Sequence, residues 1–295
     1  MDAYHPFRSS QAKERWTAAF TALEKSTWPV DSRPEYIDTS FGKTFVRICG
    51  PAAAPPLALI HGIGGNSLMW AGNIEALSQK FRTYAVDTVD DYGLSVYTRK
   101  PGSSKDYANW LDDLFSGLKI EDKVNLMGAS YGGWLTAQYA LHSPARVHKI
   151  VLLGPACTVQ PIGLSFYVRQ FLMLLPFRYF KESFFAWVME DSKKKDSASF
   201  QKMVDSLEMG MQCFKPKRSV VRPTVLSDEE LQRISALTLF MVGENEKIYS
   251  HQKAIDRLNR VAPLTTKEII PNAGHDLFTV QAEMVNRKVL EFLET

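Results

Sequence analysis

The sequence has few cysteines, no long hydrophobic run and little excess of charge. Its three cysteines, Cys49, Cys157 and Cys213, are an odd number without the spacing of a metal site, so we expect free thiols, no disulfide framework, and no metal or cofactor. The apolar runs are shorter than the roughly 20 residues that a membrane span needs. The N-terminus also lacks the apolar segment of a signal peptide. These absences favour a cytoplasmic protein with no membrane span.

The charge of the chain excludes little but gives no support for a nucleic-acid partner. The formal net charge of the 295 residues is +3. Two basic clusters, KKK at 193–195 and KPKR at 215–218, are the segments whose charge could bind nucleic acid or a membrane surface. Aromatic and basic residues do not combine around them in a recognised binding pattern, so we interpret both clusters as solvated surface.

Strands alternate with helices along most of the chain. Short unbroken apolar stretches such as LALIHG (57–62) and KIVLLG (149–154) are separated by helical patterns. Continuous apolar strands of this kind are typical of a parallel sheet covered on both faces. The sequence therefore predicts an α/β fold with a mostly parallel sheet. Its eight strands are expected at 35–40, 43–49, 57–62, 82–88, 123–128, 149–154, 237–243 and 265–270.

The alternation stops after the sixth strand. Residues 156–224 show only helical or loop patterns rich in aromatic residues, which predicts an all-helical insertion in a core made of 35–155 and 225–295. Residues 1–34 form a helical extension, because Trp16 and Phe20 belong to an apolar set with helical spacing. This extension can pack on its own chain or on a neighbouring molecule, and the sequence leaves monomer and dimer open.

A single serine stands in a tight corner between a strand and a helix. The segment Gly128-Ala-Ser130-Tyr-Gly132 follows the strand at 123–128 and precedes a helical pattern. A strand that turns directly into a helix leaves no room for large neighbours and holds the serine hydroxyl at the carboxyl edge of the sheet. The alternative is a glycine-rich helix start in which the serine is only a cap.

A serine nucleophile needs a base and an acid to orient that base. Of the six histidines, His275 lies in the loop after the last strand and opens onto the same sheet edge as Ser130. The acid is expected in the loop after 237–243, which carries Glu244 and Glu246. We favour Glu246, because it lies further from the strand end and can turn towards the histidine, and Glu244 stays as the alternative.

Four short motifs follow one another along the chain: HGIGGN (61–66), GASYGG (128–133), VGENEK (242–247) and NAGHD (272–276). In this order they resemble the motifs of the α/β-hydrolase superfamily, and more narrowly those of its carboxylesterase-like members with a helical cap. The resemblance implies that the insertion is a cap, and that the backbone N–H groups of Ile63 and Tyr131 form an oxyanion hole. Two features depart from the common pattern. The family acid is often Asp, and Asp90 replaces the first glycine of D-x-x-G-x-G-x-S, so a differently shaped loop is expected there.

The resemblance implies a serine hydrolase that cleaves esters of small to medium, mainly apolar substrates through an acyl-enzyme. The aromatic residues of the insertion, with Met69, Trp70 and Trp134, are candidates for an apolar substrate pocket. The same residues would equally serve a C–C bond hydrolase, lactonase, amidase or aminopeptidase, perhydrolase or acyltransferase. A ligand-binding receptor without turnover is a further alternative. An aminopeptidase would need a carboxylate in the insertion, for which the candidates are Glu182, Glu190, Asp191, Asp205 and Glu208.

Overall fold

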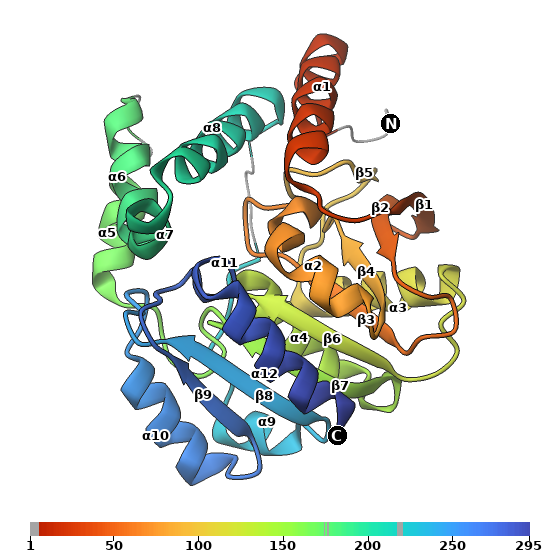
Figure 1. Cartoon of the computed structure of the whole chain (residues 1–295), viewed down its shortest axis with the longest axis vertical. Helices are drawn as coiled ribbons and strands as arrows, with labels where there is room; N and C mark the ends of the chain where they lie inside the picture. The colour runs from red at the N-terminus through yellow and green to blue at the C-terminus, as the bar shows by residue number, and fades with distance from the viewer. Residues whose placement is uncertain (1–5, 174, 176, 217–220) are drawn as a thin grey trace.

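The fold is a single twisted sheet with helices on both faces (Figure 1). The structure, a computed structural model, describes residues 6–173, 175, 177–216 and 221–295. Lys217 and Arg218 of the second basic cluster lie outside the described residues. Lys193, Lys194 and Lys195 of the first cluster are within them, in a short helix described below.

The sheet contains all eight strands that the sequence predicts. In spatial order they are β1 (Arg33–Thr39), β2 (Gly42–Cys49), β4 (Arg82–Val86), β3 (Pro56–Ile60), β6 (Val124–Ala129), β7 (Val147–Leu153), β8 (Leu237–Gly243) and β9 (Thr266–Ile270). β1 and β2 pair antiparallel, as do β2 and β4, whereas the run from β4 to β9 is parallel. The carboxyl ends of the parallel strands therefore share one edge. A ninth strand, β5 (Val96–Tyr97), pairs with β2 and was not predicted.

Alternate side chains of the central strands enter two hydrophobic cores. In β3, Ala58 and Ile60 belong to one core, while Leu57 and Leu59 belong to the other, as the two-residue period of a strand requires. One face is covered by the 3-10 helix η1 (Ser67–Trp70), α2 (Ala71–Ser78), α11 (Leu277–Val280) and α12 (Ala282–Glu294). The other is covered by α3 (Ser104–Gly117), α4 (Tyr131–His142), α9 (Asp228–Arg233) and α10 (His251–Val261). A second 3-10 helix, η2 (Pro144–Arg146), precedes β7.

Helices fill the chain between β7 and β8, where the sequence predicts an insertion. They are α5 (Leu164–Leu172), α6 (Arg178–Val188), α7 (Glu190–Lys195) and α8 (Ser197–Cys213). In Figure 1 the arrowheads of β6 and β8 point towards the side of the molecule where these four helices gather. We call residues 156–224 the helical insertion; its status as a separate domain stays a prediction.

The N-terminal extension packs on the helical insertion of its own chain. Its helix α1 (Ser10–Thr27) lies beside α8 (Figure 1) and buries Trp16 and Phe20. The ring centroids of Trp16 and Phe214, just after α8, are 5.3 Å apart, and Arg15 donates a hydrogen bond to the Gln212 side chain. The N-terminal extension thus packs against the C-terminal end of α8 in the helical insertion.

No helix in the described part of the chain combines the length and apolarity that a membrane crossing requires.

The three cysteines, Cys49, Cys157 and Cys213, are buried free thiols. Burial raises the pKa of all three thiols, and nearby hydrogen bonds or arginines only partly offset this effect. Such thiols remain protonated and unreactive at neutral pH.

Candidate active site

Ser130 occupies the sharp corner between β6 and α4. Its backbone has φ 52° and ψ −116°, a strained conformation for a residue with a side chain. The corner leaves no space for side chains two residues away: a Cβ at Gly128 would lie 2.3 Å from Gly132 O, and one at Gly132 would lie 2.2 Å from Ile60 O. The small residues of the motif are therefore a steric requirement of the turn.

His275 and Glu246 form a buried pair at the same sheet edge. His275 Nδ1 lies 2.9 Å from Glu246 Oε2, and the carboxylate is fully buried. A carboxylate can only accept, so Nδ1 carries the proton and Nε2 is left as the basic nitrogen. The second oxygen, Oε1, accepts from Ile248 N–H at 2.9 Å. The alternative acid, Glu244, instead accepts from Asn272 N–H at the surface, so the geometry favours Glu246.

The segment after β7 brings the serine corner and the histidine–glutamate pair together. Ser130 N–H donates to Leu153 O at 2.9 Å, and Ala156 N–H donates to Ser130 O at 3.0 Å. Between them, a Cβ on Gly154 would lie 3.3 Å from Glu246 Oε2 and 3.4 Å from His275 Nδ1. Among the described residues, Ser130 Oγ makes no hydrogen bond to the His275 imidazole. Catalytic hydrogen bonds are often long before substrate binds and tighten in the complex.

The environment of His275 shifts its basicity in two directions. Burial lowers the pKa of the imidazole, but the charge and hydrogen bond of Glu246, with a smaller contribution from Asp276, raise it by more. The net result is a pKa above the ordinary value of 6.5. The imidazole is thus a stronger base than a free histidine.

Two backbone amides lie beside Ser130 without partners in the secondary structure. Ile63 lies in a turn directly against the corner, since a Cβ on the preceding Gly62 would be 3.3 Å from Ser130 Cβ. No hydrogen-bond acceptor for Ile63 N–H is found among the described residues. Tyr131 N–H is the first amide of α4 and has no intrahelical acceptor. Both predicted oxyanion donors therefore lie close to the serine in the chain or in space, and their role in binding a developing negative charge stays a prediction.

Comparison with known proteins identifies the family. The α/β-hydrolase fold model matches residues 55–282, which is most of the chain. The chain belongs to the α/β-hydrolase family.

The relatives of this α/β hydrolase cover nearly its whole length. Carboxylesterase YbfK of Bacillus subtilis is 36% identical over 272 residues, 91% of this chain and 90% of the relative. The uncharacterized carboxylesterase nap of the same organism is 37% identical over 269 residues, 90% of this chain and 88% of the relative. The crystal structure of naproxen esterase (carboxylesterase NP) from Bacillus subtilis superposes with a TM-score of 0.88 at 35% identity, and covers 97% of this chain and 99% of that one.

The three side chains suggested for the substrate pocket of this α/β hydrolase lie at different depths. Met69 lies under the Ile63 turn, where its Sδ accepts from Gly62 N–H at 3.4 Å. Trp70 has no exposed surface and packs on Phe278 in one core. Trp134 is 1% exposed and packs on Tyr131. Met69 is thus beside the candidate site, both indoles pack in the interior, and a pocket-lining role for the three stays a prediction.

The loop after β4 was expected to depart from the common α/β-hydrolase pattern, and its conformation shows how. Asp90 adopts φ 65°, the left-handed region that favours glycine, and its carboxylate lies 3.4 Å from Lys100 Nζ. Asp91, which the sequence analysis did not single out, accepts from Gly64 N–H in the Ile63 turn. The two adjacent aspartates of VDDYG (89–93) were the feature of the sequence that could have drawn attention to Asp91.

The short helix α7 of the insertion contacts both loops that carry the histidine–glutamate pair. Ser192 N–H donates to Asp276 Oδ2 at 2.9 Å, next to His275. Asn245 Nδ2 donates to Asp191 Oδ2 at 3.1 Å, next to Glu246. At the start of α7, Glu190 forms an ion pair with Lys247. At its end, Lys195 donates a hydrogen bond to Val280 O. Sequence reasoning missed these contacts, because they join segments more than 50 residues apart.

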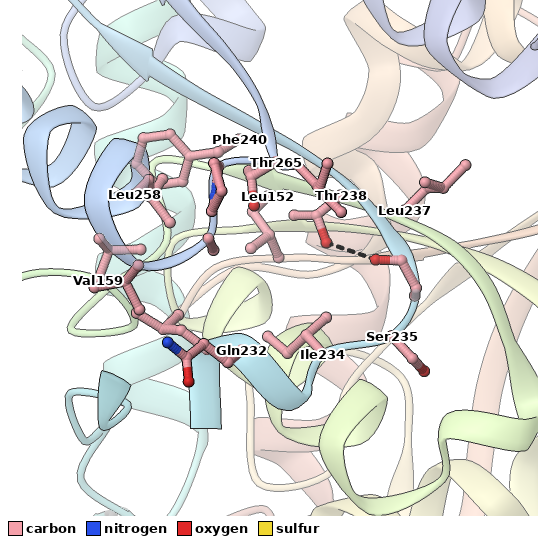
Figure 2. Close-up of a pocket in the computed structure, with 16 residues that line it drawn as sticks. Leu152, Val159, Gln232, Ile234, Ser235, Leu237, Thr238, Phe240, Leu258 and Thr265 are labelled. Atoms are coloured by element: carbon pink, nitrogen blue, oxygen red, sulfur yellow. Dashed lines mark hydrogen bonds between the residues drawn. The ribbon is translucent and has the colours of Figure 1, made fainter. Parts of the chain in front are cut away.

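A cavity elsewhere in the molecule is separate from this site. It is lined by residues of β8, α9 and α10 (Figure 2) and has a volume of about 240 Å³. Its walls include Leu152, Phe240 and Leu258, and Thr238 at the amino end of β8 donates to Ala236 O at 3.0 Å. None of the candidate site residues lines it. The cavity therefore has no part in the proposed chemistry.

Proposed function

We propose that this α/β hydrolase is a serine carboxylesterase that cleaves esters of small to medium, mainly apolar substrates through an acyl-enzyme. The observation that carries the proposal is the buried His275–Glu246 pair at the strand edge where Ser130 stands in its strained corner. The carboxylesterase names of relatives that match about nine-tenths of the chain support it. A cytoplasmic location and a monomer or dimer in solution stay predictions.

The proposed reaction uses each group in one role. His275 Nε2 takes the Ser130 proton as the hydroxyl attacks the ester carbonyl, and the Glu246 carboxylate stabilises the imidazolium that forms. The amides of Ile63 and Tyr131 stabilise the oxyanion. His275 then protonates the leaving alcohol. Water repeats the attack on the acyl-enzyme with the same base, which releases the acid and restores the serine.

An aminopeptidase function is less well supported by the carboxylates of the insertion. Such an enzyme needs a carboxylate that is free to bind a substrate ammonium. The Arg178 guanidinium already contacts Glu182, Asp205 and Glu208. Glu190 contacts Lys194 and Lys247, and Asp191 accepts from Asn245. Each of the five candidates thus has a partner, which favours an uncharged substrate.

The ester preference should follow chain length. Large apolar side chains are exposed on α5 of the helical insertion, among them Leu164, Val168 and Phe171, and an insertion of this character favours an apolar acyl or alcohol group. Each buried methylene contributes about 0.8 kcal/mol. We therefore expect kcat/KM for p-nitrophenyl esters to rise roughly tenfold or more from acetate to butyrate or hexanoate. A series in which acetate is the best substrate would contradict an apolar pocket.

The pH profile should reflect the raised pKa of His275. The imidazole must be neutral to act as a base, so activity should fall as the pH drops through the pKa of the histidine. Because Glu246 raises that pKa above 6.5, the acid limb of kcat/KM should have its midpoint above 6.5 rather than below it. The measurement is kcat/KM for one ester between pH 4 and 9. A rate that stays flat down to strongly acid pH would exclude His275 as the base.

A further inference from the structure

The turn that carries Ile63 depends on its surroundings for its conformation. Gly65 N–H donates to Gly62 O at 3.0 Å, and Gly64 has φ +79°, which defines a type II turn with Ile63 and Gly64 at its centre. Three of its four residues are glycines, which adopt many backbone conformations. The central peptide can also turn over to give a type I turn with the same ends. Something outside the turn must therefore select one arrangement.

Two side chains from outside the turn hold alternate amides. Met69 Sδ accepts from Gly62 N–H at 3.4 Å. Asp91 accepts from Gly64 N–H with both carboxylate oxygens, at 2.9 and 3.0 Å. Asp91 is only 6% exposed, and its Oδ1 also accepts from Tyr92 N–H at 2.9 Å. The hydrogen bond to Asp91 is stronger than the one to Met69, because ionised acceptors bind amides about twice as strongly as neutral ones.

The amide between the two held ones is Ile63 N–H, the one that the proposed function assigns to the oxyanion hole. If the Ile63–Gly64 peptide turned over, Gly64 N–H would leave Asp91 and the Ile63 carbonyl would face the negative carboxylate, which is unfavourable. Ile63 N–H belongs to the preceding peptide and would keep its direction, but the turn would lose the contact that holds it on the C-terminal side of Ile63. We propose that Asp91 is a positioning residue for the esterase reaction: by anchoring the Gly64 amide it holds the turn in place, so that Ile63 N–H stays beside Ser130. This inference rests on the proposed function.

The experiment compares Asp91→Ala and Asp91→Asn with Asp90→Asn as the matched control. Asparagine keeps one acceptor oxygen for Gly64 N–H, whereas alanine keeps none. Asp90 is an equally buried neighbouring acid whose carboxylate contacts Lys100. For Asp91→Ala we expect kcat to fall about 10- to 100-fold with KM within about threefold, less than the roughly 10²- to 10³-fold loss of a whole oxyanion donor. Asp90→Asn should stay within about fivefold of wild type, and Asp91→Asn should lie between wild type and Asp91→Ala, because its oxygen still accepts from Gly64 N–H but carries no charge.

Two readouts separate positioning from general damage. A trifluoromethyl ketone forms a tetrahedral oxyanion with the serine, whereas the corresponding alcohol does not. In Asp91→Ala the ketone should bind about 10- to 100-fold more weakly and the alcohol equally well. Hydrogen exchange of Gly64 N–H, followed by NMR without any substrate, should be at least about tenfold faster in the same variant.

Each result has one meaning. Unchanged Gly64 exchange in Asp91→Ala would show that the carboxylate does not anchor the turn, whatever the activity. Faster exchange with unchanged ketone binding, or ketone and alcohol weakened alike, would overturn the positioning role. The proposed function fails separately if the wild-type protein hydrolyses no ester of the panel. In that case Asp91→Ala would still accelerate the exchange of Gly64 N–H if the carboxylate anchors the turn.

Discussion

Replacing Ser130 with alanine is expected to lower kcat for ester hydrolysis by roughly 10⁴- to 10⁶-fold. The hydroxyl is the atom that bonds to the acyl group, so its loss leaves only the oxyanion amides and substrate binding to act on water. The corner itself should persist, because alanine fits between Gly128 and Gly132 as readily as serine. The measurement is steady-state turnover of the best p-nitrophenyl ester, together with the melting temperature.

A serine at the other end of the same helix supplies the control. Ser143, the C-cap of α4, donates to Asp112 at 3.0 Å and has no contact with the proposed site, so Ser143→Ala should keep turnover within about twofold. A fluorophosphonate probe should label the wild type and Ser143→Ala but not Ser130→Ala. Labelling at any other residue, or turnover that survives in Ser130→Ala, would contradict the proposed nucleophile.

Glu246→Gln should lower kcat by roughly 10³- to 10⁴-fold, the second largest effect that we expect. Both oxygens of this carboxylate accept, one from His275 and one from Ile248 N–H. An amide of the same shape has only one accepting oxygen, so its nitrogen must face one of those two N–H donors. It also has no charge to stabilise the imidazolium. The acid limb of the pH profile should shift to lower pH at the same time.

Glu244→Gln is the matched control, because it changes a carboxylate two residues away in the same loop. Glu244 accepts from Asn272 N–H at the surface, where an amide oxygen can replace the carboxylate. Turnover should therefore remain within about threefold of wild type. Wild-type turnover in Glu246→Gln combined with an inactive Glu244→Gln would assign the acid to Glu244 and refute our choice.

Much of the fold was predictable because it depends on local patterns. The central parallel strands β3 and β7 are apolar runs whose side chains enter both cores, and all eight predicted strands form. The family was equally visible in four short motifs, and the model match over residues 55–282 confirms it. β5 escaped prediction because two residues, Val96 and Tyr97, are too few to show a periodic pattern.

The supporting contacts of the candidate site were beyond the sequence. Asp91 touches Gly64 across 27 residues, and Asp276 touches Ser192 across 84; no local pattern specifies such pairs. The burial of individual side chains was equally difficult to predict from the sequence. Trp70 and Trp134 were candidates for the substrate pocket, but helical packing directs both indoles into the interior, where a large aromatic ring buries the most apolar surface.

The four contacts of α7 have a consequence for anyone who wishes to redesign this protein. A chimaera that exchanges residues 156–224 for those of a relative would also exchange Asp191 and Ser192, which bind the neighbours of Glu246 and His275. Selectivity and turnover are therefore not separately adjustable modules. Laboratory evolution that changes the insertion to admit a new ester should alter kcat along with KM, unless α7 is retained.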